Sequence, residues 1–512
     1  MRSVLLAFTA LSLTAAPALA QDAAQIAPKP AALVADGLPP VPQALVDRTR
    51  PYMEFRTASF QDWDPQTKSM LVSTRFGNVA QLHSVAGPLM ARRQISFEAE
   101  PIGGTYLPGD GTLVVAKDKG GDEFYQLYTL KDGRLTLITD GKSRNSLSAV
   151  SADGKLIGLS STRRNGTDTD LYVMDPRDPA SAKMVLQVSG GGWSLADFAP
   201  GNQAALVANY KSVEKTNLFW LDLTTGKLTP IGNHKKAIAY GGGKFAPDGS
   251  LWVTSDEGGD FQRLGTLDPK TGKFTPRSPE PKWDVEGFDI AADGSFIAYV
   301  VNEAGISKLR LLDPKTGAVR EVTGLPKGVI GSVKIAPWGT IGLTVSSARV
   351  PSDAYSVDPA TLAVTRWTES ETGGLDPAKN AEPEFVEVKS FDGETVSGFL
   401  YRPDPAKFPG KRPLIVSIHG GPESQFAPGF RGRANYLINE LGVAMFHPNV
   451  RGSTGFGKRF VGLDNGPFLR ENSVKDIGPF LDRLAGDGAI DAGRMAVTGG
   501  SYGGYMCYAS AI

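Results

Sequence analysis

Cysteine and histidine are scarce in this sequence. Its 512 residues include one cysteine, Cys507, and four histidines. A single cysteine excludes an internal disulfide framework and a structural zinc site built from several cysteines. We therefore expect no metal and no other cofactor, and we expect Cys507 to be a small buried apolar side chain rather than a reactive thiol.

An excess of either charge is also absent. The 54 Lys and Arg residues balance the 54 Asp and Glu residues, which argues against nucleic acid or an anionic membrane surface as a partner. Beyond the N-terminus, no apolar run approaches the 18 residues or so that span a bilayer, so no membrane partner is expected. The sequence has 41% hydrophobic and 21% charged residues, a composition that excludes a disordered or coiled-coil protein.

The first 20 residues have the pattern of an export signal. Arg2 is followed by an apolar stretch from Val4 to Leu13 and by the small-residue sequence Ala18-Leu19-Ala20. This order is typical of a cleaved signal peptide, whereas a buried N-terminal helix is the alternative. The pattern predicts residues 1–20 as a signal peptide, residues 21–55 as an N-terminal segment, and an exported, periplasmic protein.

A turn followed by an apolar strand recurs seven times between Asp64 and Ser346. The copies align, 43 to 49 residues apart, on Gln66, Asp110, Asp153, Asn202, Asp248, Asp293 and Trp338. Most copies contain a second turn, such as Asp268 to Gly272, so each repeat holds two hairpins. Four strands in 40 to 50 residues are typical of a propeller blade, and unrelated hairpins would not be so evenly spaced. The repeats predict a seven-bladed β-propeller over residues 56–380, with blades from about Phe60 to Thr368.

The pattern changes near Asn380, and residues 381–512 alternate strands with helices. The expected elements are strands at 385–388, 396–400, 413–418, 443–446 and 495–498, a helix ending at 440, and a helix over 473–484. Ser473 is expected to cap the last helix. This order predicts a partial α/β-hydrolase domain after the propeller.

The last strand runs into Gly499-Gly500-Ser501-Tyr502-Gly503. Gly-x-Ser-x-Gly between a strand and a helix is the pattern of a nucleophile elbow, a turn so sharp that side chains two positions from the serine would collide with it. The elbow predicts Ser501 as the nucleophile. A glycine-rich turn with an idle serine is the alternative.

A glycine loop, His419-Gly420-Gly421-Pro422, follows an apolar strand 82 residues before Ser501. Such a loop leaves backbone N–H groups free to face an oxyanion, together with the N–H of the residue after the nucleophile. We expect Gly421 and Tyr502 to be these donors. Taken alone, the loop would be a tight turn with no catalytic role.

Three motifs together resemble the prolyl oligopeptidase family of serine peptidases, in its acylaminoacyl-peptidase and dipeptidyl-peptidase-like branch. They are His419 to Pro422, Asn449 to Gly457 and Gly499 to Gly504. The resemblance implies a propeller before the hydrolase domain, Ser501 as nucleophile, Gly421 and Tyr502 as oxyanion donors, and Arg451 near the floor of the site. For Arg451 we weigh substrate binding against a structural ion pair.

The chain departs from this family after Ser501. Members carry the triad Asp and then His in some 150 further residues, whereas this sequence ends 11 residues past the nucleophile. All four histidines precede Ser501. We therefore expect a truncated member that hydrolyses its substrates weakly or not at all, since a serine without a base is a poor nucleophile.

Three functions remain open at this stage. A serine peptidase acting on short peptides is the first, an esterase with the same acyl-transfer site is the second, and a non-catalytic propeller binding module is the third. Two acidic pairs, Asp122-Glu123 and Asp256-Glu257, are either anchors for a peptide amino terminus or solvated loop charges. The oligomeric state is not predicted.

Overall fold

The computed structural model describes residues 25–279 and 282–511 and divides into two units. The first unit ends at Pro51, and its described part holds helix α1, Gln43–Thr49, and an isolated bridge between Ile26 and Pro42. The signal peptide predicted over residues 1–20 lies outside the described residues. Nowhere in the described ranges is there a helix with the length and apolar character needed to cross a membrane.

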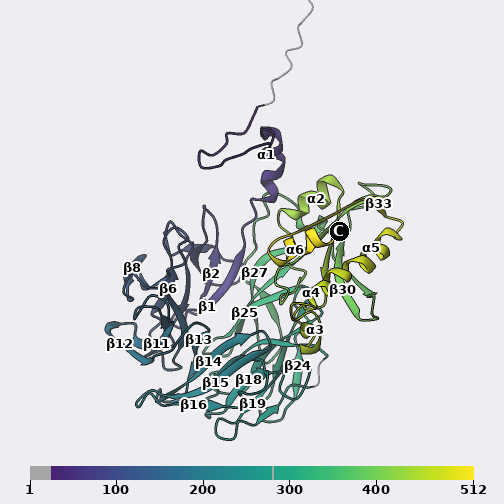
Figure 1. Cartoon of the computed structure of the whole chain (residues 1–512). Coiled ribbons are helices and arrows are strands. Elements are labelled where there is room, and N and C mark those ends of the chain that lie inside the picture. Colours follow the sequence, from purple (N-terminus) through teal and green to yellow (C-terminus); the bar gives the residue numbers. More distant parts are fainter. Residues whose placement is uncertain (1–24, 280–281, 512) are drawn as a thin grey trace, which may run out of the picture. The chain divides into compact units, whose positions relative to one another are not determined.

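Seven four-stranded antiparallel sheets make up most of the second unit (Figure 1). Each sheet, or blade, consists of four consecutive strands, and strands of successive blades lie side by side. Strand β1 of the first blade also contacts β25, β26 and β27 of the seventh, which closes the ring. The predicted seven-bladed propeller is therefore confirmed.

The blades follow the sequence from Ala58 to Arg366. The strands of the first three are β1 Ala58–Trp63, β2 Met70–Thr74, β3 Gln81–Val85, β4 Arg92–Gln94; β5 Gly103–Tyr106, β6 Leu113–Lys117, β7 Gln126–Lys131, β8 Arg134–Leu137; and β9 Asn145–Val150, β10 Ile157–Ser161, β11 Asp170–Asp175, β12 Asp178–Leu186. Those of the fourth and fifth are β13 Trp193–Phe198, β14 Ala204–Ser212, β15 Lys215–Asp222, β16 Leu228–Ile231; and β17 Tyr240–Phe245, β18 Leu251–Ser255, β19 Arg263–Leu267, β20 Phe274–Pro276. Those of the last two are β21 Val285–Ile290, β22 Ile297–Glu303, β23 Ile306–Leu312, β24 Val319–Glu321; and β25 Val329–Ile335, β26 Ile341–Ser347, β27 Val350–Val357, β28 Val364–Arg366.

The recurring turns pack one blade against the next. In the third blade, Gly154 has φ +68°, and a Cβ atom there would lie 2.0 Å from the carbonyl oxygen of Pro108 in the second blade. Glycine is required at this position by both its left-handed conformation and this close contact. At this turn, a glycine of the repeat therefore allows the second and third blades to pack closely.

No strand of the first blade pairs with a strand of the seventh. The two blades are therefore joined by contacts between side chains. Trp63 lies edge-on to Trp338 and Trp367, with ring centroids 5.5 and 5.3 Å apart. The ammonium group of Lys334 pairs with the Asp62 carboxylate at 2.8 Å. An aromatic cluster and an ion pair therefore close the ring.

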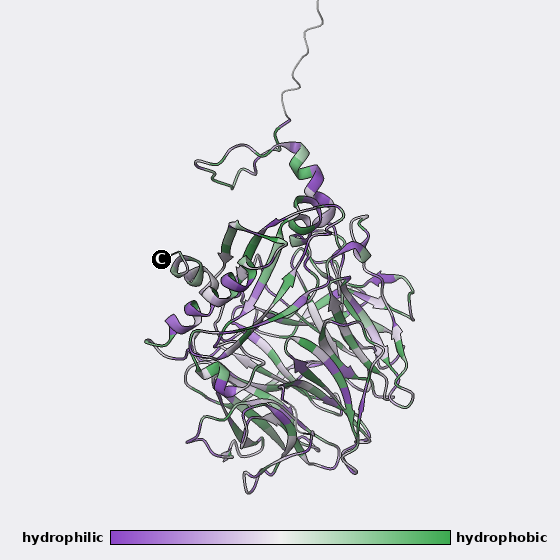
Figure 2. Ribbon diagram, turned by 90° about the vertical axis from the view of Figure 1, so that its right-hand side faces the viewer, coloured by the Kyte–Doolittle hydropathy of each residue, from purple (hydrophilic) through white to green (hydrophobic). Residues whose placement is uncertain are grey.

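A five-stranded sheet follows the propeller, in the order β29-β30-β32-β31-β33. Its strands are β29 Glu384–Lys389, β30 Thr395–Tyr401, β31 Arg412–Ile418, β32 Ala444–Asn449 and β33 Ile490–Gly499. The first two pair antiparallel, while β31 runs parallel to β32 and β33. Buried side chains of these strands pack on Phe480 and Leu484, as the green strands in Figure 2 reflect. The five predicted strands are confirmed, and the α/β-hydrolase fold with them.

The helices of this domain differ from the prediction at one place. They are α2 Ala434–Leu441, α3 Lys458–Gly462, α4 Arg470–Lys475, α5 Ile477–Ala485 and α6 Tyr502–Ala509. The single helix predicted over 473–484, with Ser473 as its cap, is wrong: α4 begins at Arg470 and α5 follows after Asp476. Pro479 explains the break, because it has no N–H for the Lys475 carbonyl and its ring would collide with that group. Ser473 lies inside α4 and donates to the Arg470 carbonyl at 2.7 Å.

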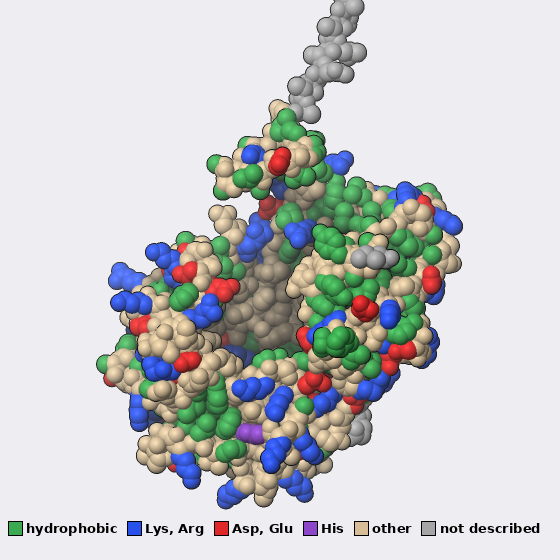
Figure 3. Space-filling model, viewed as in Figure 1, with side chains coloured by type: hydrophobic (Ala, Val, Ile, Leu, Met, Phe, Trp, Pro, Cys, Tyr) green, Lys and Arg blue, Asp and Glu red, His purple; other side chains and the backbone are tan. Residues whose placement is uncertain are grey.

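The propeller and the α/β domain are joined by polar contacts. Lys458 pairs with Asp256 at 3.0 Å, and the Asn302 amide donates to Gln425 at 2.6 Å. A cavity of about 590 Å³ lies at this boundary, but neither the elbow nor the glycine loop lines it. Figure 3 shows that the surface is hollowed between the propeller and the α/β domain.

Candidate active site

The turn from β33 into α6 has the form of a nucleophile elbow. Ser501 stands between the two elements, with φ +55° and ψ −125°. This backbone conformation is unfavourable for a residue with a side chain and is found where the surrounding structure imposes it. Ser501 is exposed, and no partner for its hydroxyl exists among residues 25–279 and 282–511.

The flanking glycines are required for a reason slightly different from the one predicted. A Cβ atom on Gly499 would lie 2.3 Å from the carbonyl oxygen of Gly503, so the two ends of the turn would collide with each other rather than with Ser501. Gly500, between them, has open space around its Cβ position. Steric crowding therefore requires glycine at the first position of the Gly-x-Ser-x-Gly pattern, Gly499, but not at Gly500.

The glycine loop lies beside the elbow, as the sequence predicts. Strands β31 and β33 pair with Ile418 opposite Gly499, so the residues after Ile418 continue next to Ser501. A Cβ atom on Gly420 would lie 3.1 Å from the Ser501 Cβ and 3.6 Å from its Oγ. Within the described part of the chain, no acceptor is present for the backbone N–H of Gly421 or of Tyr502. That both groups converge on one oxyanion remains a prediction.

None of the four histidines hydrogen-bonds to Ser501 in the described structure. His419 Nε2 lies 3.1 Å from Ser453 Oγ and its Nδ1 lies 2.7 Å from the Gly420 carbonyl oxygen. His447 is buried in β32 and stacks on Phe426 at 4.0 Å, while His83 and His234 lie in the propeller. Burial lowers the pKa of His419 and lowers that of His447 further. Burial thus favours the neutral form of His419 and His447.

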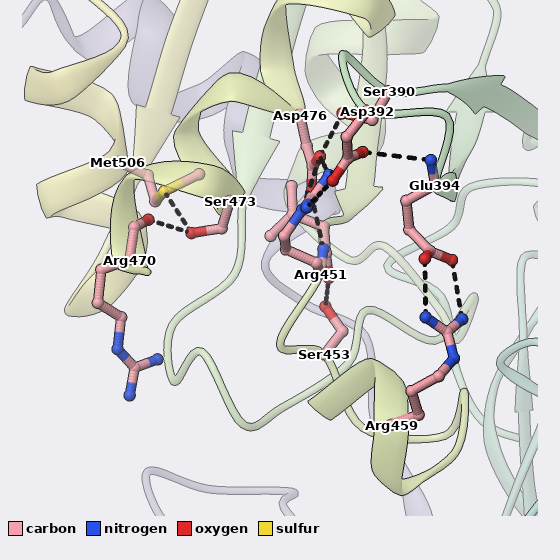
Figure 4. A network of polar contacts seen from close by, with 11 residues as sticks. Ser390, Asp392, Glu394, Arg451, Ser453, Arg459, Arg470, Ser473, Asp476 and Met506 are labelled. Atoms are coloured by element: carbon pink, nitrogen blue, oxygen red, sulfur yellow. Dashed lines mark hydrogen bonds and ion pairs between the residues drawn. The ribbon is translucent and has the colours of Figure 1, made fainter. Parts of the chain in front are cut away.

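Arg451 is held in a buried ion network (Figure 4). Its guanidinium bonds both oxygens of Asp392, at 2.7 and 3.0 Å, and its backbone N–H donates to Asp476 at 2.9 Å. Nε and Nη2 also donate to Asp476, which is completely buried, and Arg451 itself is 2% exposed. Bonding to the guanidinium holds the pKa of Asp392 well below its usual range. The structure therefore supports the ion-pair alternative for Arg451 over the substrate-binding role.

A family model identifies this part of the chain. Residues 428–512, which include the Arg451 motif, the elbow and α6, match the model described as Prolyl oligopeptidase family. This part of the chain is thus similar to the prolyl oligopeptidase family. The matched residues hold the second and third of the three motifs, and the resemblance is confirmed there.

Two curated proteins named as dipeptidyl peptidases match longer stretches of the chain. Dipeptidyl aminopeptidase BIII of Pseudoxanthomonas mexicana is 32% identical over 168 residues, which are 30% of this chain and 24% of that protein. Dipeptidyl-peptidase 5 of Porphyromonas gingivalis is 26% identical over 272 residues, 52% of this chain and 39% of that one. The matched stretches thus make up less than half of these relatives.

The solved structure of puromycin hydrolase shares the fold. It superposes with a TM-score of 0.75 at 19% identity, over 90% of this chain and 76% of that one. At this identity the likeness supports the architecture alone, a propeller followed by a hydrolase domain.

The acidic pairs of the propeller are engaged in local contacts. Asp122 accepts from the Phe124 N–H at 2.9 Å, and Glu257 accepts from the Tyr240 hydroxyl at 3.0 Å. Asp256 is buried against Lys458. These contacts favour loop and interface roles over the anchoring of a peptide amino terminus.

The contacts of the residues behind the elbow, and the part played by Arg470 in them, were not predicted from the sequence. The Tyr502 hydroxyl bonds Ser473 at 2.7 Å, and the Arg470 guanidinium lies over the Tyr502 ring at 5.6 Å.

Cys507 is half-buried rather than buried, and its thiol donates to the Val497 carbonyl at 3.2 Å. Within the described ranges, no group of three or more His, Cys, Asp or Glu side chains is arranged to hold a metal.

Proposed function

We propose that the protein is a serine hydrolase that cleaves short peptides through an acyl-enzyme on Ser501. The observation that carries the proposal is the position of Ser501, exposed at a strained elbow and in contact with the glycine loop at Gly420. The family and the relatives named as dipeptidyl peptidases support peptides as the substrate class.

The proposed reaction begins with attack of Ser501 Oγ on the carbonyl carbon of the scissile bond. The carbonyl oxygen then becomes an oxyanion, which accepts hydrogen bonds from the N–H groups of Gly421 and Tyr502. The N-terminus of α6 adds a favourable partial positive charge. Collapse of the tetrahedral intermediate expels the amine, and water later releases the acyl group.

The serine proton needs an acceptor, and the described residues offer none. His419 bonds Ser453, and His447 is buried against Phe426. Without a base, the oxyanion donors alone give residual catalysis of about 10³–10⁴ over water in serine proteases. We therefore expect the 512-residue polypeptide by itself to turn over slowly or not at all.

The test compares the 512-residue polypeptide with its Ser501→Ala variant on an activated peptide ester. Ser510→Ala, at the C-cap of α6 where the hydroxyl donates to the Met506 carbonyl, serves as the matched control. The proposal expects slow turnover that Ser501→Ala removes and Ser510→Ala keeps. Turnover that survives Ser501→Ala would overturn it. Fast turnover that Ser501→Ala removes would instead show that a base exists among these residues.

The esterase and the binding module remain the alternatives. An esterase would cleave the ester but not the matching peptide amide, even at long incubation. A binding module would bind the peptide with equal affinity in the Ser501→Ala variant and release no product. Calorimetry with a short peptide, followed by mass spectrometry of the mixture, separates the three.

We also propose that the protein is exported to the periplasm through residues 1–20. The sequence Ala18-Leu19-Ala20 after an apolar stretch supports this proposal. N-terminal sequencing of protein from the periplasmic fraction should begin at Gln21. Recovery of the chain in the cytoplasm with Met1 intact would contradict export.

A further inference from the structure

One arginine contacts both segments that carry the predicted oxyanion donors. Arg470, the first residue of α4, places Nη2 3.2 Å from the Glu423 carboxylate and its guanidinium over the Tyr502 ring. Glu423 stands two residues after Gly421, and Tyr502 directly follows Ser501. We propose that Arg470 is a positioning residue, which clamps the glycine loop to the elbow. The inference rests on the proposed function.

A buried carboxylate orients the guanidinium. Asp464 is 1% exposed and lies 3.4 Å from Arg470 Nη1. Gly452 makes room for it, because a Cβ atom there would lie 2.3 Å from Asp464 Oδ1. Asp464 thus bonds Nη1 of Arg470, while Nη2 bonds Glu423 and the flat face of the guanidinium lies over the Tyr502 ring.

The side chain of Tyr502 is held at both ends. Ser473 donates its hydroxyl proton to the Arg470 carbonyl at 2.7 Å, so its oxygen accepts from the Tyr502 hydroxyl. The ring meanwhile lies under the Arg470 guanidinium, with 5.6 Å between the guanidinium carbon and the ring centroid, a cation–π contact. Both contacts come from the first turn of α4, so this turn fixes the residue whose N–H is to face the oxyanion.

The consequence for catalysis follows from geometry. Oxyanion donors act only when they are held in place before the reaction, within about 0.5 Å of the productive position. The Glu423 pair restrains the loop on one side of the site, and the Tyr502 contact restrains the elbow on the other. Loss of Arg470 should therefore lower kcat and leave KM nearly unchanged.

The deciding experiment is hydrogen exchange of the 512-residue polypeptide, which does not depend on turnover. In Arg470→Met, amides of segments 419–426 and 500–506 should both exchange about fivefold faster, the effect of about 1 kcal/mol. Glu423→Gln should speed exchange in the first segment alone. Arg470→Lys should fall between the parent and Arg470→Met in both segments, because one ammonium group cannot contact Asp464, Glu423 and the Tyr502 ring together. Arg494→Met is the control, since Arg494 is 59% exposed and pairs with Asp491.

Two results would overturn the clamp. One is unchanged exchange in both segments of Arg470→Met, and the other is an equal increase throughout the α/β domain, which would mean general destabilisation. Where turnover depends on Ser501, a change in KM with constant kcat would also contradict positioning. Turnover that survives Ser501→Ala would refute the proposed function instead, and hydrogen exchange would still decide the clamp.

Discussion

Gly503 lies directly against the carbonyl oxygen of Ile418, so that a Cβ atom on Gly503 would be 2.2 Å from that oxygen. Ile418 ends β31, and Gly503 belongs to the first turn of α6. This contact joins the elbow to the strand that leads into the glycine loop. It thereby sets how Ser501 lies relative to Gly420.

Gly503→Ala should destabilise the α/β domain by about 1–3 kcal/mol, the usual cost of forcing an extra methyl into a packed site. Gly500→Ala is the matched control, because its Cβ position is open. Thermal unfolding followed by circular dichroism should show a lower Tm for Gly503→Ala and an unchanged Tm for Gly500→Ala. Equal Tm values for the two variants would contradict the packing described here.

Removal of Arg451 should be among the most costly single changes in the α/β domain. Arg451→Met leaves the fully buried Asp476 carboxylate without its main cation, and breaking such a pair costs about 3–5 kcal/mol. Arg494→Met, which breaks an exposed pair with Asp491, should cost less than about 1 kcal/mol. Urea unfolding of both variants measures the difference. A similar midpoint for the two would show that Arg451 is not structural.

Features fixed by neighbouring residues were predictable from the sequence. The turn at Asp153-Gly154 needs a positive φ, and the glycines around Ser501 are needed for close approach, so both could be recognised locally. The break between α4 and α5 is also local, because Pro479 signals it, although the sequence on both sides of the proline is helical.

Contacts between distant segments could not be predicted in this way. Arg470 and Glu423 are 47 residues apart, and a charged pair of this kind is common on any protein surface. Trp63 and Trp338 meet because the ring closes, which the repeat spacing implies without naming the side chains involved. For Arg451, both roles fitted the motif, and the buried position of Asp476 decides between them.

Closure of the propeller depends on Trp63. This side chain is 3% exposed and contacts Trp338 and Trp367 of the seventh blade. Trp63→Ala should destabilise the propeller by about 3–5 kcal/mol through the cavity it leaves. Limited proteolysis should then cut first between the first and seventh blades, near residues 52–57 and 367–380. Unchanged unfolding and cleavage would show that the ring is closed by other contacts.

The propeller should lose stability as the pH rises through 6, owing to Asp197. Burial raises the pKa of this carboxyl from 3.8 to about 6, against the opposing effects of the Phe245 N–H and Lys244. The folded chain therefore binds the proton more tightly than the unfolded chain does, and the resulting stability is present at low pH and is lost as the pH rises from about 4 to 6. At 1.36 kcal/mol per pKa unit, ionisation costs at most about 3 kcal/mol at pH 7.5 and about half of that at pH 5.

Asp197→Asn keeps an acceptor for the Phe245 N–H but carries no charge, so it should raise the urea midpoint more at pH 7.5 than at pH 5. An equal change at both pH values would mean that Asp197 titrates near its ordinary pKa.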